Sequence, residues 1–379
     1  MTTTINNEHN KLNVPNLRFP EFQGEWEEYR IEDITENISS GKCKSHSSNG
    51  EYNLYGSTGI IGKTDEACYE GNLVLVARVG ANAGFLQIIN EPCGITDNTL
   101  IIKPQKVGAQ YIYYYLQHFN LNRLIFGSGQ PLITGGMLKK VKVSLGNIQE
   151  QNKLTRLLSL LDERIATQNK IIDKLQSLIK GINQRVFMNS GINYKLGEIC
   201  EIRNGYSGSQ LLSKKGLKVS RIETISGHKV NMERVGYVEP FESSEKYRLR
   251  VGDILFSNIN SVEYIGNTAF IDKDYDLYHG MNLLRLTPNN MVVIPFYLYL
   301  LLNTNRMLNH FKTVCNKAVS QASINQTELG KTVIQIPPIK TQKQICELYQ
   351  ALYTKLETAS HTKSLFQNQK QYLLRQMFI

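Results

Sequence analysis

The sequence predicts an α+β protein with a pseudo-two-fold repeat: two tandem globular domains separated by two long helices that pack as an antiparallel coiled coil. Three observations predict this fold. Residues 148–188 align with residues 339–379 without a gap. Both segments carry heptad-spaced apolar residues, as coiled coils do. The segments before them contain short apolar runs bounded by Gly, Asn, Asp and Pro, which is typical of strands.

The repeat extends upstream of the two long segments. Residues 29–34 match residues 194–199, and the aromatic run at 111–116 matches the run at 296–301. The matched blocks occur in the same order in both halves, whereas the intervals between them differ in length. We therefore predict two globular domains that share a framework and differ in their loops.

Strands and shorter helices are expected within each globular domain. Residues 71–75 match residues 252–256, which makes the strands in these two blocks equivalent. Apolar runs that predict strands lie at 73–77, 99–102, 253–256 and 283–286. Helical stretches are expected near 109–124 and 294–311.

Heptad spacing defines the contact face of each long helix. Steps of four and three residues from Leu154 and from Ile345 land mainly on apolar residues. The second copy has polar residues late in this seam, including Lys370, so we expect a weaker or wetter interface there. Two amphipathic helices packed onto separate domains are the alternative. The predicted seam comprises Leu154, Leu158, Leu161, Ile165, Ile172, Leu175, Ile179, Ile182, Ile345, Leu352, Leu356, Phe366 and Leu373.

These patterns define the expected domain organisation. A polar amino-terminal tail at 1–15 precedes a first globular domain at 16–147 and a central helix at 148–190. A second globular domain at 191–338 precedes a carboxy-terminal helix at 339–379. Each globular domain has a normal size for an independent core.

Composition favours a polyanionic partner. The chain has 43 Lys and Arg against 33 Asp and Glu, a net charge of +10. Basic side chains docked on phosphates release counterions, although many basic proteins merely have solvated faces.

The amino-terminal segment lacks the apolar core of a signal peptide, and no apolar run is long enough to cross a membrane. Six scattered cysteines without metal-ligand spacing are expected to be reduced thiols, which favours a cytoplasmic protein.

Motifs for catalysis are missing from the sequence. Residues 56–64 resemble a phosphate-binding loop, but Gly56 lies one residue too far from Gly62, and a glycine-rich turn is the better interpretation. The sequence around Pro337 and Pro338 lacks the acidic or amide residue and the aromatic of an adenine methyltransferase loop, and the E-x-K of many metal-dependent nucleases does not occur. We therefore predict a binding protein without catalytic residues and without a metal or cofactor of its own.

Basic and polar residues in loops are the candidates for binding nucleic acid. Arg and Lys suit phosphates and guanine edges, and Asn and Gln can pair with adenine. Each such residue taken alone is more often a solvated surface group. The candidates in the first half are Lys42, Lys44, Lys63, Arg78, Ser128 and Gln130. Those in the second half are Arg203, Lys214, Lys215, Lys218, Arg221, Asn258, Asn260, Lys317 and Gln321.

Together these segments resemble a known family. Their order and duplication are similar to those of a DNA sequence-specificity (S) subunit of type I restriction–modification systems. The resemblance covers nearly the whole chain after residue 15, although TQKQICELYQALYTKL in the second helix departs from the usual pattern. It rests on the segments at 17–34, 55–62, 127–145, 148–165, 195–205 and 318–345.

The resemblance implies a function as well as a fold. Each globular domain would be a target-recognition domain that reads one half of an asymmetric bipartite site in double-stranded DNA. The paired helices would space the domains and dock two methyltransferase (modification) subunits, and restriction subunits with translocase activity would complete the complex. S-adenosylmethionine, ATP and magnesium would belong to these partners. A helix of about 38 residues would span roughly 57 Å, more than one turn of DNA at about 34 Å.

Two other classes of function stay open on the sequence alone. A coiled-coil adaptor would bind proteins through its globular domains, without sequence-specific DNA binding. An enzyme with strongly diverged motifs would methylate or cut DNA by itself. Sequence preference in DNA binding separates the first class from the S-subunit hypothesis, and activity of the isolated chain separates the second.

Overall fold

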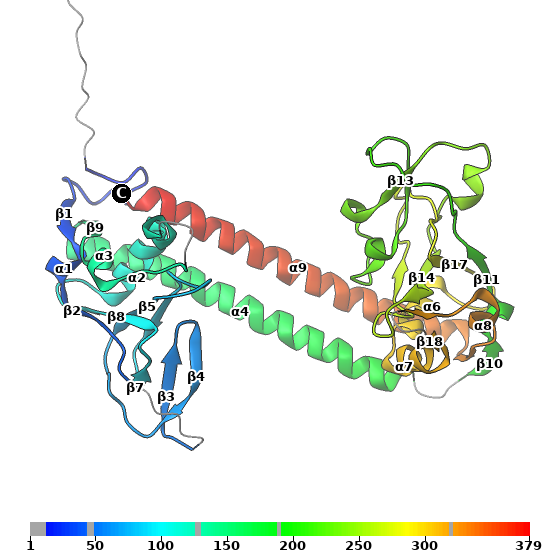
Figure 1. The fold of residues 1–379 in the computed structure, drawn as a ribbon, viewed down its shortest axis with the longest axis horizontal. Helices are drawn as coiled ribbons and strands as arrows, with labels where there is room; N and C mark the ends of the chain where they lie inside the picture. The colour runs from blue at the N-terminus through cyan, green and yellow to red at the C-terminus, as the bar shows by residue number, and fades with distance from the viewer. Residues whose placement is uncertain (1–12, 44–48, 126–129, 188–190, 318–320) are drawn as a thin grey trace, which may run out of the picture. The chain divides into compact units, whose positions relative to one another are not determined.

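The computed structural model describes residues 13–43, 49–125, 130–187, 191–317 and 321–379. Lys44, Ser128 and most of the predicted tail lie outside these residues. The chain divides into two compact units, and each long helix contributes to both (Figure 1). Unit 1 comprises Met1–Lys170 and Ser360–Ile379, and unit 2 comprises Ile171–Ala359.

Unit 1 is organised around an antiparallel four-stranded sheet. Its strand order is β2 (Thr35–Ser40), β8 (Thr99–Pro104), β5 (Leu73–Ala77) and β6 (Leu86–Ile89). A second sheet consists of β4 (Gly59–Thr64), β3 (Tyr52–Gly56) and β7 (Cys93–Ile95). The remaining elements are β1 (Glu27–Arg30) paired with β9 (Lys142–Leu145), the helices α1 (Ile31–Ile34), α2 (Ala109–Phe119) and α3 (Gly135–Lys139), and the 3-10 turn η1 (Leu121–Leu124).

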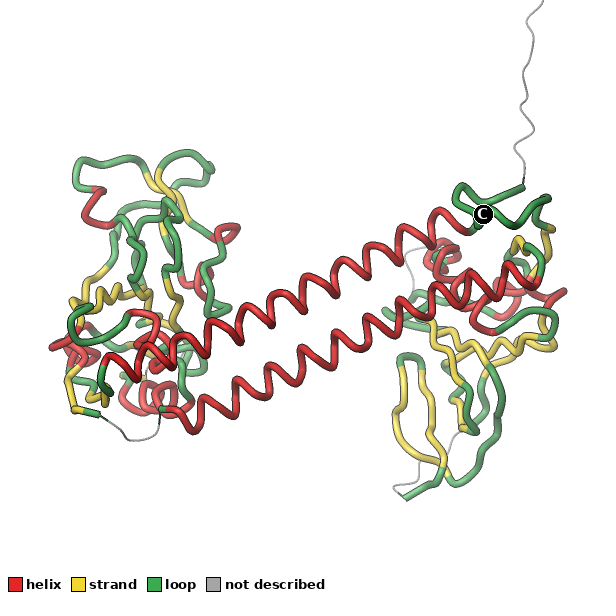
Figure 2. The backbone as a smooth tube through the Cα atoms, turned by 180° about the vertical axis from the view of Figure 1, so that it is seen from behind, coloured by secondary structure: helices red, strands yellow, loops and turns green. Residues whose placement is uncertain are grey.

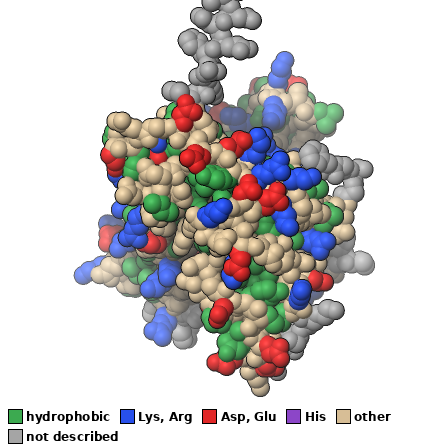
Figure 3. Space-filling view, turned by 90° about the vertical axis from the view of Figure 1, so that its left-hand side faces the viewer, with side chains coloured by type: hydrophobic (Ala, Val, Ile, Leu, Met, Phe, Trp, Pro, Cys, Tyr) green, Lys and Arg blue, Asp and Glu red, His purple; other side chains and the backbone are tan. Residues whose placement is uncertain are grey.

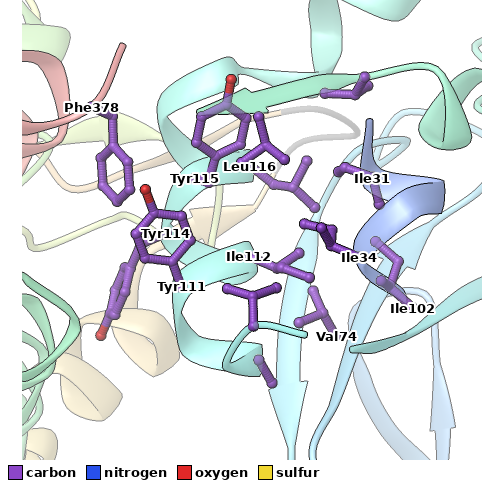
Figure 4. Packing of buried hydrophobic residues seen from close by; sticks show 14 of the residues in the cluster. Ile31, Ile34, Val74, Ile102, Tyr111, Ile112, Tyr114, Tyr115, Leu116 and Phe378 are labelled. Carbon is purple, nitrogen blue, oxygen red and sulfur yellow. The ribbon is translucent and has the colours of Figure 1, made fainter. Parts of the chain in front are cut away.

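The two faces of this sheet pack into two different cores. Alternating strand residues point to opposite faces, so Val74 and Ile102 pack with α2, whereas Leu73 and Ile101 pack toward β7. Figure 4 shows the first of these cores, in which the carboxy-terminal Phe378 also lies against the tyrosines of α2. The end of α9 is therefore part of the core of unit 1.

Unit 2 repeats this arrangement. Its four-stranded antiparallel sheet has the order β11 (Cys200–Asn204), β17 (Leu283–Pro288), β14 (Ile254–Ser257) and β16 (Thr268–Phe270). Its other strands are β10 (Ile192–Lys195) paired with β20 (Val333–Ile336), β12 (Leu217–Val219) paired with β13 (Gly236–Val238), and the small sheet of β15 (Ile259–Asn260), β19 (Ala322–Ser323) and β18 (Asn316–Lys317). Its helical segments are α5 (Leu196–Ile199), α6 (Pro295–Leu302), α7 (Asn305–Val314), α8 (Gln326–Gly330), η2 (Ile222–Ile225), η3 (Met232–Arg234) and η4 (Ser244–Tyr247).

Strand registers confirm the internal repeat and correct one detail of it. Ile102 pairs with Val74 in unit 1, and its equivalent Leu286 pairs with Ile254 in unit 2. The strand equivalent of Ile254 is therefore Val74. The sequence match, which aligned the glycines of the two blocks, instead sets Leu73 against Ile254. That match is wrong by one residue. A slip of one residue would turn every side chain of the strand to the opposite face, which the two cores do not allow.

The long helices are α4 (Ile148–Val186) and α9 (Ile339–Met377), both continuous (Figure 2). Within unit 1, Asp162 bonds to Lys370, and Arg164 lies over the ring of Phe366. Numbers rise on α4 as they fall on α9, so the helices run antiparallel, and the predicted coiled coil is confirmed. Every predicted seam residue is buried or half-buried.

A buried carboxylate fixes the amino-terminal segment of unit 1 to α4. Glu150 is 2% exposed, and it accepts hydrogen bonds from Arg18 at 2.7 and 2.8 Å and from the Trp26 indole at 3.1 Å. The hydrogen bond with Glu150 raises the pKa of the Arg18 guanidinium. Close by, the Leu17 amide donates to the carbonyl oxygen of Gln376 on α9, so this segment contacts both long helices.

Candidate nucleic-acid interface

Three of the unit 1 candidates lie on segments that meet at one end of the four-stranded sheet, where Arg78 bonds through its backbone to Asn98 and Ile133 and Gly41, next to Lys42, bonds to Thr99. Lys42 is exposed after β2, Lys63 is exposed on β4, and Gln130 is exposed before α3. Arg78 is half-buried at the end of β5, and its Nε has no hydrogen-bond partner in the described part of the chain. On the face of unit 1 seen in Figure 3, Lys and Arg side chains are spread among acidic and uncharged ones. The structure thus brings the segments of Lys42, Arg78 and Gln130 together, whereas Lys63 lies on a strand of the second sheet.

In unit 2 the small sheet brings three candidates together. Two of them are close in the sequence, and the third is distant from both. Asn260 on β15 pairs with Ala322 of β19, and Ala322 pairs with Lys317 of β18. Gln321, directly before β19, and Lys317 are both exposed. This sheet places Lys317 and Gln321 beside the turn that carries Asn260.

The two asparagines of that turn hold its backbone. Asn258 is only 8% exposed, and its carbonyl oxygen accepts from the amide of Ile324. Asn260 donates to Ser257 Oγ at 3.0 Å and accepts from the Ser261 amide at 2.8 Å. The Asn258 side chain is buried and the Asn260 side chain is half-buried and bonded within its own turn, and base reading by these two amides stays a prediction.

The remaining candidates of unit 2 lie on or beside β12 and β11. Lys214 and Lys215 are exposed before β12, and Lys218 is half-buried on it. Arg221 is exposed and lies 3.5 Å from Glu223. Arg203 on β11 is exposed, bonds to Glu201, and lines a cleft of about 510 Å³.

Sequence reasoning missed four further cations that line this cleft, namely Lys246, Arg248, Arg250 and Arg285. A usable signal was present in the repeat. The strand LLRLTP of the second half matches TLIIKP of the first, so Arg285 stands where the other copy has Ile101. A charge at an apolar position of a repeated strand is unusual enough to be noticed.

Metal and thiol chemistry find no support in the described residues. Within them, no cluster of three His, Cys, Asp or Glu side chains could hold a metal ion. The cysteines are unpaired, and burial raises the pKa of Cys93 and of Cys200 to about 12, so neither is an activated thiol. No helix among these residues is long and apolar enough to cross a membrane.

The two units share a sheet order and register, are joined by two long shared helices and differ in their loops, which defines a duplicated two-domain architecture. The family described as "Type I restriction modification DNA specificity domain" matches residues 23–177 and again residues 192–365. The chain belongs to this family, and it carries two copies of the domain. Membership confirms the predicted family. It also assigns the chain to the specificity subunits of restriction–modification systems rather than to their catalytic subunits.

Individual relatives agree with this assignment. The putative type I restriction enzyme MjaX specificity subunit of Methanocaldococcus jannaschii is 40% identical over 188 residues, which are 48% of this chain and 44% of that protein. The MjaVIII specificity subunit of the same organism is 25% identical over 414 residues and covers 97% of this chain and 94% of that one. A type I restriction–modification S subunit from M. genitalium has the same fold, with a TM-score of 0.67 at 16% identity over 97% of this chain and 99% of that chain.

Proposed function

We propose that this chain selects the DNA sequence on which a type I restriction–modification complex acts, with each unit reading one half of an asymmetric bipartite site. The two copies of the specificity domain carry this proposal. Since the units share sheet order and register, they can present equivalent surfaces to DNA. Since their loops differ in length and sequence, they are expected to read different half-sites.

The small sheet of unit 2 supports part of that role. Lys317 and Gln321 are exposed beside each other and combine a phosphate-binding cation with an amide that can pair with a base. In unit 1, Lys63 on β4 and Lys42 after β2 are exposed cations.

Exposed apolar residues on the long helices support docking of modification subunits. In unit 2, Ile171 and Leu178 of α4 are 39% and 49% exposed and lie one heptad apart, on one face of the helix. In unit 1, Leu365 and Tyr372 of α9 have the same spacing and are 53% and 56% exposed. Ile171 and Leu178 flank the seam of α4, and Leu365 and Tyr372 lie outside the seam of α9. Because they are exposed, these rows are suited to pack against a partner.

S-adenosylmethionine, ATP and magnesium are assigned to the partner subunits in this proposal. The chain would supply specificity, spacing and docking, and the methyltransferase and translocase subunits would supply the chemistry. A coiled-coil protein-binding adaptor is not favoured, because the family match covers both units.

The test is co-expression of the chain with its modification subunit in cells that lack other adenine methyltransferases, followed by genome-wide mapping of methylated adenines. The expected result is one split motif with a fixed gap, which disappears when the chain is omitted. Methylation that is unchanged without the chain would contradict the proposal.

A further inference from the structure

A cluster of cations surrounds the cleft of unit 2. The cleft opens beside β11, β17 and the segment that leads into β14, and it has a volume of about 510 Å³. Its cationic lining residues are Arg203, Lys246, Arg248, Arg250 and Arg285, and its acidic ones are Glu201, Glu245 and Asp253. The lining therefore carries more positive than negative charge.

Arg285 is the buried member of this cluster. It is 7% exposed, and its terminal nitrogens donate to the carbonyl oxygens of Arg248 at 3.1 Å and Lys246 at 3.2 Å. Its Nε has no partner among the residues that the structure describes. Burial lowers the pKa of this guanidinium, which nevertheless stays charged at neutral pH. A buried cation with an unused donor is unfavourable unless a counter-charge compensates it.

Unit 1 shows that the sheet does not require these charges. Register places Ile101 at the position of Arg285, and Ser39 at the position of Arg203. By the same register, Leu73 of unit 1 occupies the position that Asp253 has in unit 2. In unit 1 the corresponding face is an apolar core that contains Leu73 and Ile101. Because the same strand order is built with apolar residues there, the sheet itself does not require the charges of unit 2.

Part of the positive charge is not neutralised within the chain. Arg203 pairs with Glu201, and Arg248 pairs with Asp274 at 3.0 Å. Asp253 accepts hydrogen bonds from the Arg250 amide at 2.8 Å and the Thr287 hydroxyl at 2.6 Å, and its negative charge acts to raise the pKa of Arg285 against the effect of burial. In the described part of the chain, the side chains of Lys246 and Arg250 form no ion pair. They are exposed at the cleft, where an anionic ligand could reach them.

We propose that this cleft binds a backbone phosphate of DNA, with Lys246 and Arg250 as exposed contacts and Arg285 as the buried donor behind them. Guanidinium groups offer planar pairs of donors that match phosphate oxygens. The inference rests on the proposed function of the chain and deepens it. Because unit 1 has no counterpart, the site strengthens phosphate contacts at one half of the bipartite target only. A free phosphate or pyrophosphate is the other source of the same chemistry.

The test uses the full chain in complex with its modification subunits and a random-sequence duplex, since phosphate contacts are independent of sequence. Affinity is measured over a range of NaCl concentrations for the wild type and for Lys246→Gln and Arg250→Gln. Each phosphate contact that is lost should reduce the slope of log affinity against log salt by about 0.9. Lys340→Gln, which removes an exposed charge elsewhere in unit 2, is the matched control and should leave the slope unchanged.

The outcomes distinguish a DNA phosphate from a free anion as the ligand of the cleft. Unchanged slopes in both cleft variants, with normal binding by the wild type, overturn the inference and leave the proposed function intact. Calorimetric binding of inorganic phosphate or pyrophosphate that is lost in these variants, with an unchanged DNA slope, assigns the cleft to a free anion instead. A wild-type complex that binds no DNA contradicts the proposed function itself. Arg285→Met adds a buried variant, and its thermal unfolding shows whether the segment held by Arg285 has stayed folded.

Discussion

Lys370 of α9 places its ammonium group 2.7 and 2.9 Å from the two carboxylate oxygens of Asp162 on α4, within unit 1. The hydroxyl of Tyr114 donates to the same carboxylate at 2.9 Å, and the ring of Tyr114 lies 5.1 Å from the ammonium nitrogen. Lys370 occupies a seam position that the sequence led us to expect as weak or wet. In the structure Lys370 is bonded within a partly buried charge network. The polar part of the seam therefore makes a defined contact between the two helices rather than a merely weak one.

The first prediction concerns this network. Asp162→Ala should destabilise unit 1 by about 1–2 kcal/mol, because it leaves a mostly buried ammonium without its counter-charge. Denaturant unfolding of Asp162→Ala, Lys370→Met and the double variant measures the coupling between them. If the two single effects simply add, the pair does not stabilise the helix contact in the way described here.

The second prediction concerns the carboxy-terminal aromatic ring. Phe378 is 2% exposed, and its ring centroid lies 5.4 Å from that of Tyr111 and 5.9 Å from that of Tyr115. Phe378→Ala should lower the free energy of unfolding of unit 1 by about 3 kcal/mol and speed proteolysis of the end of α9. Ile379→Ala is the matched control, since Ile379 is exposed. Equal effects of the two variants would refute the idea that Phe378 anchors the helix.

The third prediction is a pH dependence of unit 2. Burial lowers the pKa of His279 from 6.5 to about 4, so the unfolded chain binds a proton more readily than the folded one between these values. The stability that neutral His279 provides is therefore complete above pH 6.5 and is lost as the pH falls toward 4. The expected loss is about 2 kcal/mol between pH 7 and pH 5.

Denaturant unfolding at both pH values measures this loss, with His279→Gln as the comparison. The variant should show a smaller difference in stability between pH 7 and pH 5 than the wild type. An identical difference would mean that other groups control the pH dependence.

The fourth prediction tests the docking rows of the long helices. Leu178→Lys should weaken binding of the modification subunit at least tenfold, because a charge replaces an exposed apolar contact at the interface. Ser177→Lys adds the same charge one residue away on another face of the helix and should change the affinity little. Analytical ultracentrifugation or surface plasmon resonance with purified subunits gives both values. Equal binding by Leu178→Lys and the wild type would exclude this face.

Much of the framework could be predicted from the sequence because local pattern and tertiary burial agree there. The strand predicted at 73–77 is β5 as observed, and the heptad seam is buried or half-buried along both long helices. The predicted helix near 294–311 is in fact two, since Thr304 caps a new helix by accepting from the Met307 amide. Such a break depends on a single capping residue within an apolar run, which periodicity does not reveal.

The candidate site was predictable only in part. Loop cations such as Lys317 could be named from composition, but their neighbours depend on the small sheet that joins residues more than fifty positions apart. Asn258 looked like a base-reading amide, but its side chain is buried, and its side-chain oxygen has no hydrogen-bond partner in the described part of the chain. The arginine cleft needs strand register, which places Arg203 opposite Arg285.

The reading of one half-site by each unit is tested by exchanging residues 16–147 for the corresponding domain of another specificity subunit. Methylated adenines are then mapped in cells that carry the exchanged chain and its modification subunit. We predict that one half of the split motif changes while the other half stays as in the parent. A motif that changes in both halves, or in neither, would contradict independent reading by the two units.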